Sequence, residues 1–152
     1  MFKLISGLIN LNAALAQKAR SEMAYDEALA LRGKKDFKNA FPLMVEAAEL
    51  GNEQAMALLG STYLLGEGVK EDGVQAVKWL QKSIDAGYEG GISVLGMAYA
   101  TGKAGVRIDI ETARKMLTYC AEKGDEQSAR MLSMMDRGEG MFKNLKKTKR
   151  SK

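Results

Sequence analysis

The sequence predicts an all-α fold, a solenoid of about three and a half copies of one helix-turn-helix unit. Residues 52–87 carry apolar side chains at helical spacing on both sides of a glycine-containing turn, Gly66–Val69. Helix-ending glycines recur at Gly51, Gly87 and Gly124, at spacings of 36 and 37 residues. Because one such hairpin cannot bury both of its apolar faces alone, it needs stacked copies of itself.

The best-defined unit consists of two predicted helices. The first carries one apolar face, formed by Ala55, Leu59, Gly60 and Tyr63. Asp72 is placed as the N-cap of the second, with Gln75 three residues later as in a capping box. The apolar residues of this second helix are Val74, Val77, Trp79, Leu80 and Ile84.

The other copies align with this unit almost position by position. Three positions of the second helix align as Asp36, Asp72 and Asp109, as Ala40, Ala76 and Ala113, and as Met44, Leu80 and Leu117. The first helices align Leu59-Gly60 with Leu95-Gly96, Tyr63 with Tyr99, and Gly66 with Gly102. A fourth copy begins at Glu126 and ends at Gly138–Gly140, so the array stops after a half repeat.

The segments LGSTYLLGEGV and AVKWLQKSIDAG resemble the Sel1-like repeat (SLR) family, which is related to the tetratricopeptide repeat. The resemblance covers Ala24 to Met141, although Met116 stands where the second copy has Trp79. It implies a right-handed α-solenoid that binds other proteins and is not an enzyme. Some bacterial members are immunity proteins that neutralise a secreted toxin, which makes a toxin or effector the narrower expectation for the partner.

The chain is divided into three segments: residues 1–18, a solenoid over residues 19–142, and a basic tail over residues 143–152. We predict that residues 1–18 form an amphipathic helix that caps the first repeat, because terminal repeats need a seal. Its apolar face consists of Leu4, Ile5, Leu8, Leu11, Leu15 and Ala19. A signal peptide cleaved after Ala14-Leu15-Ala16 and a membrane-surface helix are the alternatives. If residues 1–18 are a capping helix, we expect a cytoplasmic protein. If they are a signal peptide, we expect a periplasmic one.

The first repeat contains the chain's single proline, Pro42, inside its predicted second helix. Proline lacks a backbone donor and disturbs a helix interior. Two interpretations remain open: the helix is kinked at Pro42, or it starts late and holds Pro42 in its first turn.

Composition gives little support for catalysis. The 152 residues include no histidine and one cysteine, which removes the commonest general base and makes a zinc site improbable on composition. Cys120 aligns with Ala47 and Ser83 and is predicted to be a small buried thiol. We therefore predict a non-enzymatic protein without cofactor, metal or small-molecule substrate.

The predicted binding surface is the concave face formed by the first helices. The candidate protein-binding residues share positions on these helices that stacking does not use, and they are Met56, Leu58, Ser61, Leu64, Ile92, Val94, Met97, Met131 and Met134. Most are apolar, and methionine adapts well to a partner surface. The other interpretation is that they belong to the core.

Two function hypotheses follow. The leading one is a scaffold that holds a protein partner on the concave face. The alternative is a peripheral adaptor held on an anionic membrane or on nucleic acid by its tail. The tail KNLKKTKRSK carries a charge of +6, which would attract an anionic surface. Because the net charge of the whole chain is +4, the remaining residues carry a net charge of −2.

Overall fold

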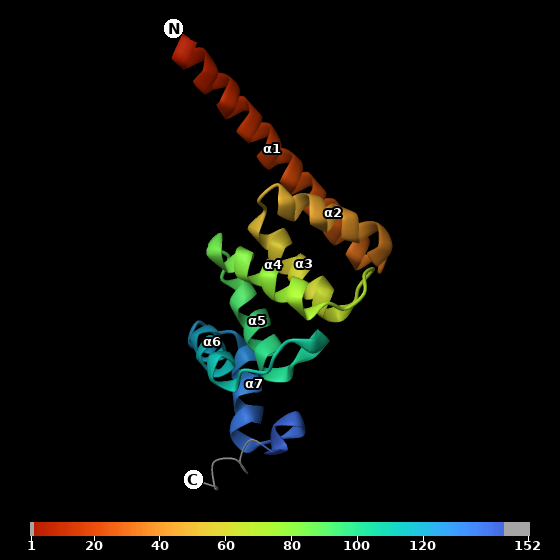
Figure 1. The fold of residues 1–152 in the computed structure, drawn as a ribbon, viewed down its shortest axis with the longest axis vertical. Coiled ribbons are helices and arrows are strands. Elements are labelled where there is room, and N and C mark those ends of the chain that lie inside the picture. Colours follow the sequence, from red (N-terminus) through yellow and green to blue (C-terminus); the bar gives the residue numbers. More distant parts are fainter. Residues whose placement is uncertain (1, 145–152) are drawn as a thin grey trace.

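The structure is a computed structural model that describes residues 2–144, with side chains described for residues 6–143. Within this part the chain is helical and contains no strand. The elements are α1 Phe2–Gly33, α2 Phe37–Glu49, α3 Glu53–Leu65, α4 Gly73–Asp85, α5 Gly90–Thr101, η1 Lys103–Gly105, α6 Ile110–Glu122, α7 Glu126–Arg137 and η2 Gly140–Asn144. Three helical hairpins followed by a half repeat confirm the predicted all-α repeat solenoid (Figure 1).

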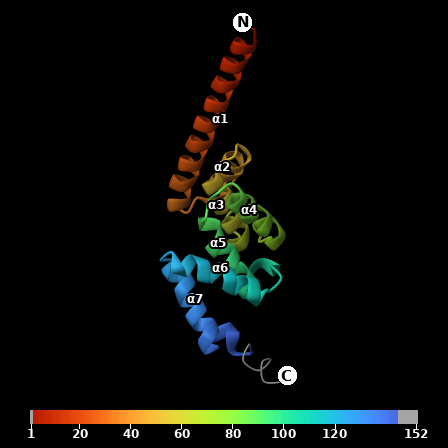
Figure 2. The same cartoon turned by 90° about the vertical axis from the view of Figure 1, so that its left-hand side faces the viewer.

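The hairpins stack in chain order. The helices pair as α1 with α2, α3 with α4 and α5 with α6, and each second helix also contacts the first helix of the next repeat. In addition α3 contacts α5, and α5 contacts α7, so the first helices of successive repeats lie next to one another. The result is an elongated stack with α1 at one extreme and η2 at the other (Figures 1 and 2).

The helix boundaries repeat with the sequence. Asp36, Asp72 and Asp109 are the N-caps of α2, α4 and α6, and each carboxylate accepts a backbone N–H of the first turn. At the other end, Gly51, Gly87 and Gly124 adopt φ values of +96°, +98° and +93°, where a side chain would be strained. The backbone N–H of the next residue then bonds a carbonyl five residues earlier, at 3.0 Å in all three repeats. The predicted N-cap aspartates and helix-ending glycines of the three repeats are confirmed.

Pro42 lies inside α2, which begins at Phe37. The late start considered from the sequence is therefore wrong. Asp36 accepts the N–H of Asn39, and this cap starts the helix ahead of the proline.

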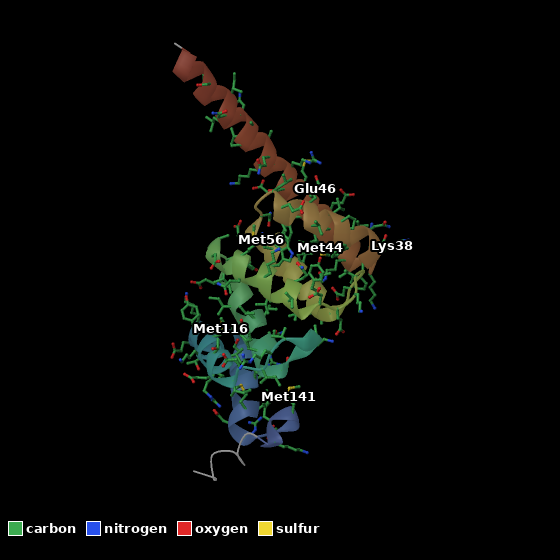
Figure 3. The ribbon with its side chains drawn as sticks, viewed as in Figure 1. Lys38, Met44, Glu46, Met56, Met116 and Met141 are labelled. Atoms are coloured by element: carbon green, nitrogen blue, oxygen red, sulfur yellow. The ribbon has the colours of Figure 1, made fainter. Side chains whose placement is uncertain are left out.

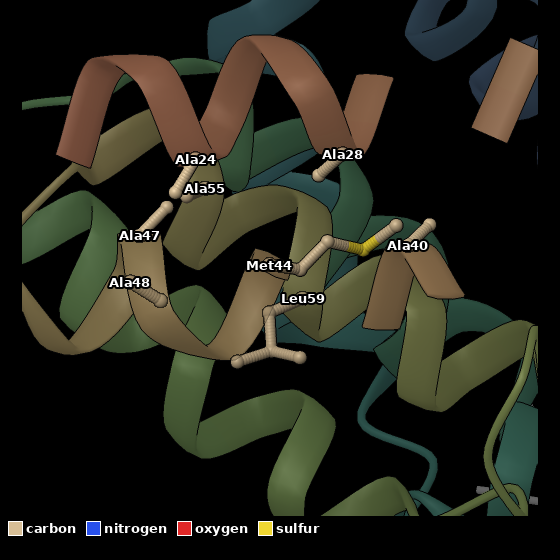
Figure 4. Close-up of a cluster of buried hydrophobic side chains, with 8 residues drawn as sticks. All are labelled: Ala24, Ala28, Ala40, Met44, Ala47, Ala48, Ala55 and Leu59. Carbon is tan, nitrogen blue, oxygen red and sulfur yellow. The ribbon is translucent and has the colours of Figure 1, made fainter. Parts of the chain in front are cut away.

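Three clusters of buried side chains run along the described part of the stack. The first joins α1, α2 and α3, where Met44 and Leu59 fill the space between small alanines (Figure 4). At the far end Phe142 on η2 is almost fully buried beside Met135. The C-terminal side of the solenoid is thus sealed by one aromatic residue that no repeat position predicts.

The N-terminal segment does not pack as the predicted cap. The helix continues without a break through residue 18 and becomes the first helix of the first repeat. Side chains 6–20 are exposed, and α1 projects away from the stack (Figures 1 and 2). The reason is that the first repeat is already covered by the second half of α1, where Ala24 and Ala28 are buried against α2 and α3.

Among the described residues, no helix combines the length and hydropathy needed to cross a membrane. The predicted basic tail lies outside the described residues from residue 145 onward, and only Lys143 and Asn144 of it fall within them.

Candidate protein-binding groove

An apolar groove of about 210 Å³ lies between α3 and α5, the first helices of two successive repeats. Its lining consists of Ser61, Leu64, Leu65, Val94, Met97, Ala98, Thr101 and Lys103. The helical period places the contributing residues of each helix on one face, and stacking of the repeats brings the two faces together. The groove therefore exists only because the repeats are stacked.

The two hydroxyl groups in the lining do not make the groove polar. Ser61 Oγ donates to the carbonyl of Ala57 at 3.0 Å, and Thr101 Oγ1 donates to the carbonyl of Met97 at 2.9 Å. Each hydroxyl is thus satisfied by its own helix and presents its carbon atoms to the groove. An apolar side chain can enter without stripping water from an unpaired donor.

The rim of the groove carries both exposed apolar surface and charge. Leu65 keeps 51% of its surface exposed, whereas Leu64 beside it is buried in the core. Lys103 Nζ bonds Glu71 Oε1 at 2.7 Å across the rim. An apolar centre with a charged rim has the organisation of a protein-binding surface.

Four of the nine predicted site residues meet in this groove: Ser61, Leu64, Val94 and Met97. The other five do not line it. Met56 and Leu58 pack against the first cluster, and Met131 and Met134 pack against the third. Ile92 is half-buried on α5 outside both the groove and the three clusters.

Figure 3 shows where the first of the predicted residues lies. Met56 is on α3, close to α2. Met56 is half-buried beneath its neighbours, since α1 and α2 continue the stack on that side. Val94 and Met97 also pack against the second and third clusters, but unlike the end positions they line the groove as well.

The sequence interpretation missed Leu65, Ala98, Thr101 and Lys103. Ala98 lies four residues after Val94, and Thr101 lies four residues after Met97, so the helical period could have found both. Lys103 follows the end of α5, on the short helix η1, and no period extends to it.

A second hollow of about 630 Å³ lies between α1 and the start of α3 and is polar. Gln17 Nε2 donates to the carbonyl of Leu50 at 3.3 Å across it. Burial raises the pKa of Tyr25, which lines this hollow. None of the nine predicted site residues lines this hollow.

Cys120 is buried, as predicted. Burial raises the pKa of its thiol, and the carboxylate of Asp125 raises it further. A neutral, covered thiol is a poor nucleophile, which is consistent with a packing role.

Comparison with known proteins supports the repeat assignment. Residues 17–52, 53–88 and 93–125 each match the Sel1 repeat. The three matched stretches follow the three hairpins, with boundaries at the Gly51 and Gly87 turns.

Three solved structures are similar to this chain. A protective antigen present in uropathogenic Escherichia coli strains and displaying an SLR fold is 32% identical, with a TM-score of 0.67, over 82% of this chain and 27% of that one. A Sel1 repeat protein from Oxalobacter formigenes is 23% identical, with a TM-score of 0.63, over 75% of this chain and 47% of that one. Helicobacter pylori cysteine-rich protein B is 23% identical, with a TM-score of 0.57, over 79% of this chain and 92% of that one.

The chain thus spans about a quarter of the length of the first of these proteins and about half of the second. The two likenesses at 23% identity establish the fold alone.

Proposed function

Because the chain belongs to the Sel1 repeat family, we propose that it is a scaffold that binds a protein partner in the groove between α3 and α5. Sel1 repeat proteins are in general protein-interaction scaffolds. The observation that carries the proposal is the convergence of residues from two repeats on one open apolar groove whose hydroxyls are already satisfied.

The groove suits a protruding apolar side chain of the partner. An anchor residue placed against Val94 and Met97 would remove apolar surface from water on both sides. The Lys103–Glu71 pair at the rim would remain solvated and set orientation more than affinity. Either a partner helix or a small domain can present such an anchor.

We further propose, on the family resemblance, that the partner is a secreted toxin or effector that the chain neutralises by binding. Neutralisation by occlusion needs only a complementary surface and no chemistry on the scaffold. The groove supplies such a surface, and its residues then decide which toxin is recognised.

The test is a double substitution in the groove, Val94→Asp with Met97→Asp, compared with Val74→Asp as the matched control. Val74 is an equally apolar residue that is 78% exposed on α4, away from the groove. We expect the double variant to lose the partner recovered by pull-down from native cells, because two carboxylates cannot be desolvated there without partners. The control should bind as the wild type does.

Folding of each variant is checked by circular dichroism. If the double variant unfolds, Leu65→Asp replaces it, since Leu65 is half exposed at the same groove. A folded groove variant that binds the partner normally would show that the partner docks elsewhere.

A further inference from the structure

The first half of α1 carries four large apolar side chains that are exposed close together on one helix. Leu8, Ile9, Leu11 and Leu15 keep between 55% and 62% of their surface exposed, and every described side chain from residue 6 to residue 20 is exposed. The N-terminal part of the helix projects away from the repeats (Figure 2), and Gln17 and Arg20 contact them through Leu50 and Glu46. Exposed apolar surface of this extent on one helix calls for something that covers it.

The exposed residues are sorted around the helix. Leu8, Leu11 and Leu15 follow at spacings of three and four and share one face. Asn10 and Gln17 are seven residues apart and share another face. This part of the helix therefore has a leucine face and a polar face, and Ile9 lies between the two.

Charge separates this half from the rest of α1. Residues 1–21 include Lys3, Lys18 and Arg20 and no acidic residue, whereas Glu22, Asp26 and Glu27 follow directly. Lys18 Nζ lies 3.9 Å from Glu22 Oε1 and Arg20 bonds Glu46 at 2.5 Å, but the two basic side chains remain 74% and 72% exposed. The charge changes sign where the helix begins to pack, since Ala24 is the first residue of α1 in the buried cluster.

We propose that this half of α1 lies on an anionic bilayer surface, with its leucines in the headgroup boundary. An apolar face next to lysine and arginine without acids is the chemistry of an interfacial helix, and it complements anionic lipid. Asn12 lies among the apolar residues, and an amide there keeps its hydrogen bonds only at a shallow depth. The acidic half of α1 is repelled by the same surface, so the repeats stay in solution.

A second copy of the chain would cover this leucine face less well than a bilayer surface does. A leucine seam with alternating spacings of four and three runs through Leu4, Leu8, Leu11 and Leu15 in the sequence. The next two seam positions are Lys18 and Glu22, which end it. Stable coiled coils need about three or four heptads, and this seam covers about two.

The experiment is co-sedimentation of the full chain with vesicles of phosphatidylcholine alone and of phosphatidylcholine with phosphatidylserine. The test variant is Leu8→Gln with Leu11→Gln and Leu15→Gln. The matched control is Val74→Gln with Ile108→Gln and Met141→Gln, three exposed apolar residues outside α1. A third variant lacks residues 143–152, so that the basic tail is assessed separately.

We expect binding to the phosphatidylserine vesicles to fall about tenfold or more in the leucine variant and to persist in the control and in the tail deletion. Binding should weaken with added salt, because part of it is electrostatic. Circular dichroism should show both substituted variants folded, since every substituted side chain is exposed.

Four results would overturn the proposal. They are no sedimentation with anionic vesicles; binding lost only with the tail; a dimer by light scattering that the leucine variant abolishes; or a cellular protein whose N-terminus is Gln17, which would identify the segment as a cleaved leader. None of these results bears on the groove, so the two proposals are tested independently.

Discussion

At the scale of single residues, Gly60 and Gly96 set the distance between the two helices of their repeats. A Cβ placed on Gly60 would lie 2.6 Å from Leu80 Cγ and 3.1 Å from the carbonyl oxygen of Ala76. One placed on Gly96 would lie 3.1 Å from Met116 Cβ and 3.2 Å from Leu117 Cγ. The second helix of each repeat thus approaches its glycine with a buried core leucine, Leu80 or Leu117.

The two glycines should respond differently to alanine. Alanine gains up to about 1 kcal/mol in helix propensity over glycine, whereas overpacking costs about 1–3 kcal/mol. We expect Gly60→Ala to lower the free energy of unfolding, because its clash involves a branch carbon and a backbone atom. Gly96→Ala should be close to neutral, and Gly96→Leu should cost roughly 1–3 kcal/mol or more.

Urea denaturation measures these differences, with Gly7→Ala as the control. A Cβ placed on Gly7 would have no neighbouring atom within 4 Å, and the helix is exposed there, so alanine at this position should not destabilise the protein. A Gly60→Ala protein as stable as the wild type would mean that α3 and α4 are further apart than described.

At the scale of the element, each second helix is started by an aspartate. In α6 the N–H of Thr112 donates to Asp109 Oδ1 at 3.0 Å, and the Thr112 hydroxyl donates to Oδ2 at 2.8 Å. The N–H and hydroxyl of Thr112 lower the pKa of Asp109 below its ordinary value, because both bonds favour the ionised carboxylate.

This cap makes the stability of α6 depend on pH. A carboxylate whose pKa is lower in the folded state stabilises the protein above its unfolded pKa, and that contribution is lost as the pH falls toward the folded value. We expect Asp109→Asn, which keeps a capping side chain, to be only slightly less stable than the wild type near neutral pH. The difference in melting temperature should shrink as the pH is lowered through the ordinary aspartate range. A difference that stays constant with pH would contradict the assigned bonds.

The element that sequence reasoning described least well is α1. Its apolar period predicts a helix, and a helix is present, but the period does not say whether the apolar face is covered. No glycine or proline interrupts residues 8–32, so the helix runs on into the first repeat instead of folding back on it. Whether such a helix packs depends on free space in the first repeat, which is a tertiary property.

At the scale of the whole molecule, the repeat made most of the fold predictable. Aligned aspartates, glycines and core leucines indicated three hairpins and a half repeat, because each position has the same neighbours in every copy. Features that break the repeat were not predictable. Phe142 seals the last cluster from beyond the repeated positions, and no periodic signal marks it.

The groove was predictable in part for the same reason. The helical period identified which face of α3 and α5 is apolar, and Ser61, Leu64, Val94 and Met97 do meet there. It could not show that Met131 and Met134 lie outside the groove although they pack against the third cluster as Met97 does, because that depends on the end of the stack. The sequence thus identifies the face, and the stacking decides where the face is open.

The most direct test of the account is hydrogen–deuterium exchange of the chain alone and bound to its partner. If the partner docks in the groove, amide protection on binding should be greatest in the C-terminal half of α3, around Ser61 to Leu65, and in α5 from Val94 onward. The second helices α4 and α6 should change little. Protection confined to the exposed half of α1 or to α6, with α3 and α5 unchanged, would contradict the claim that this solenoid binds through the groove between its first helices.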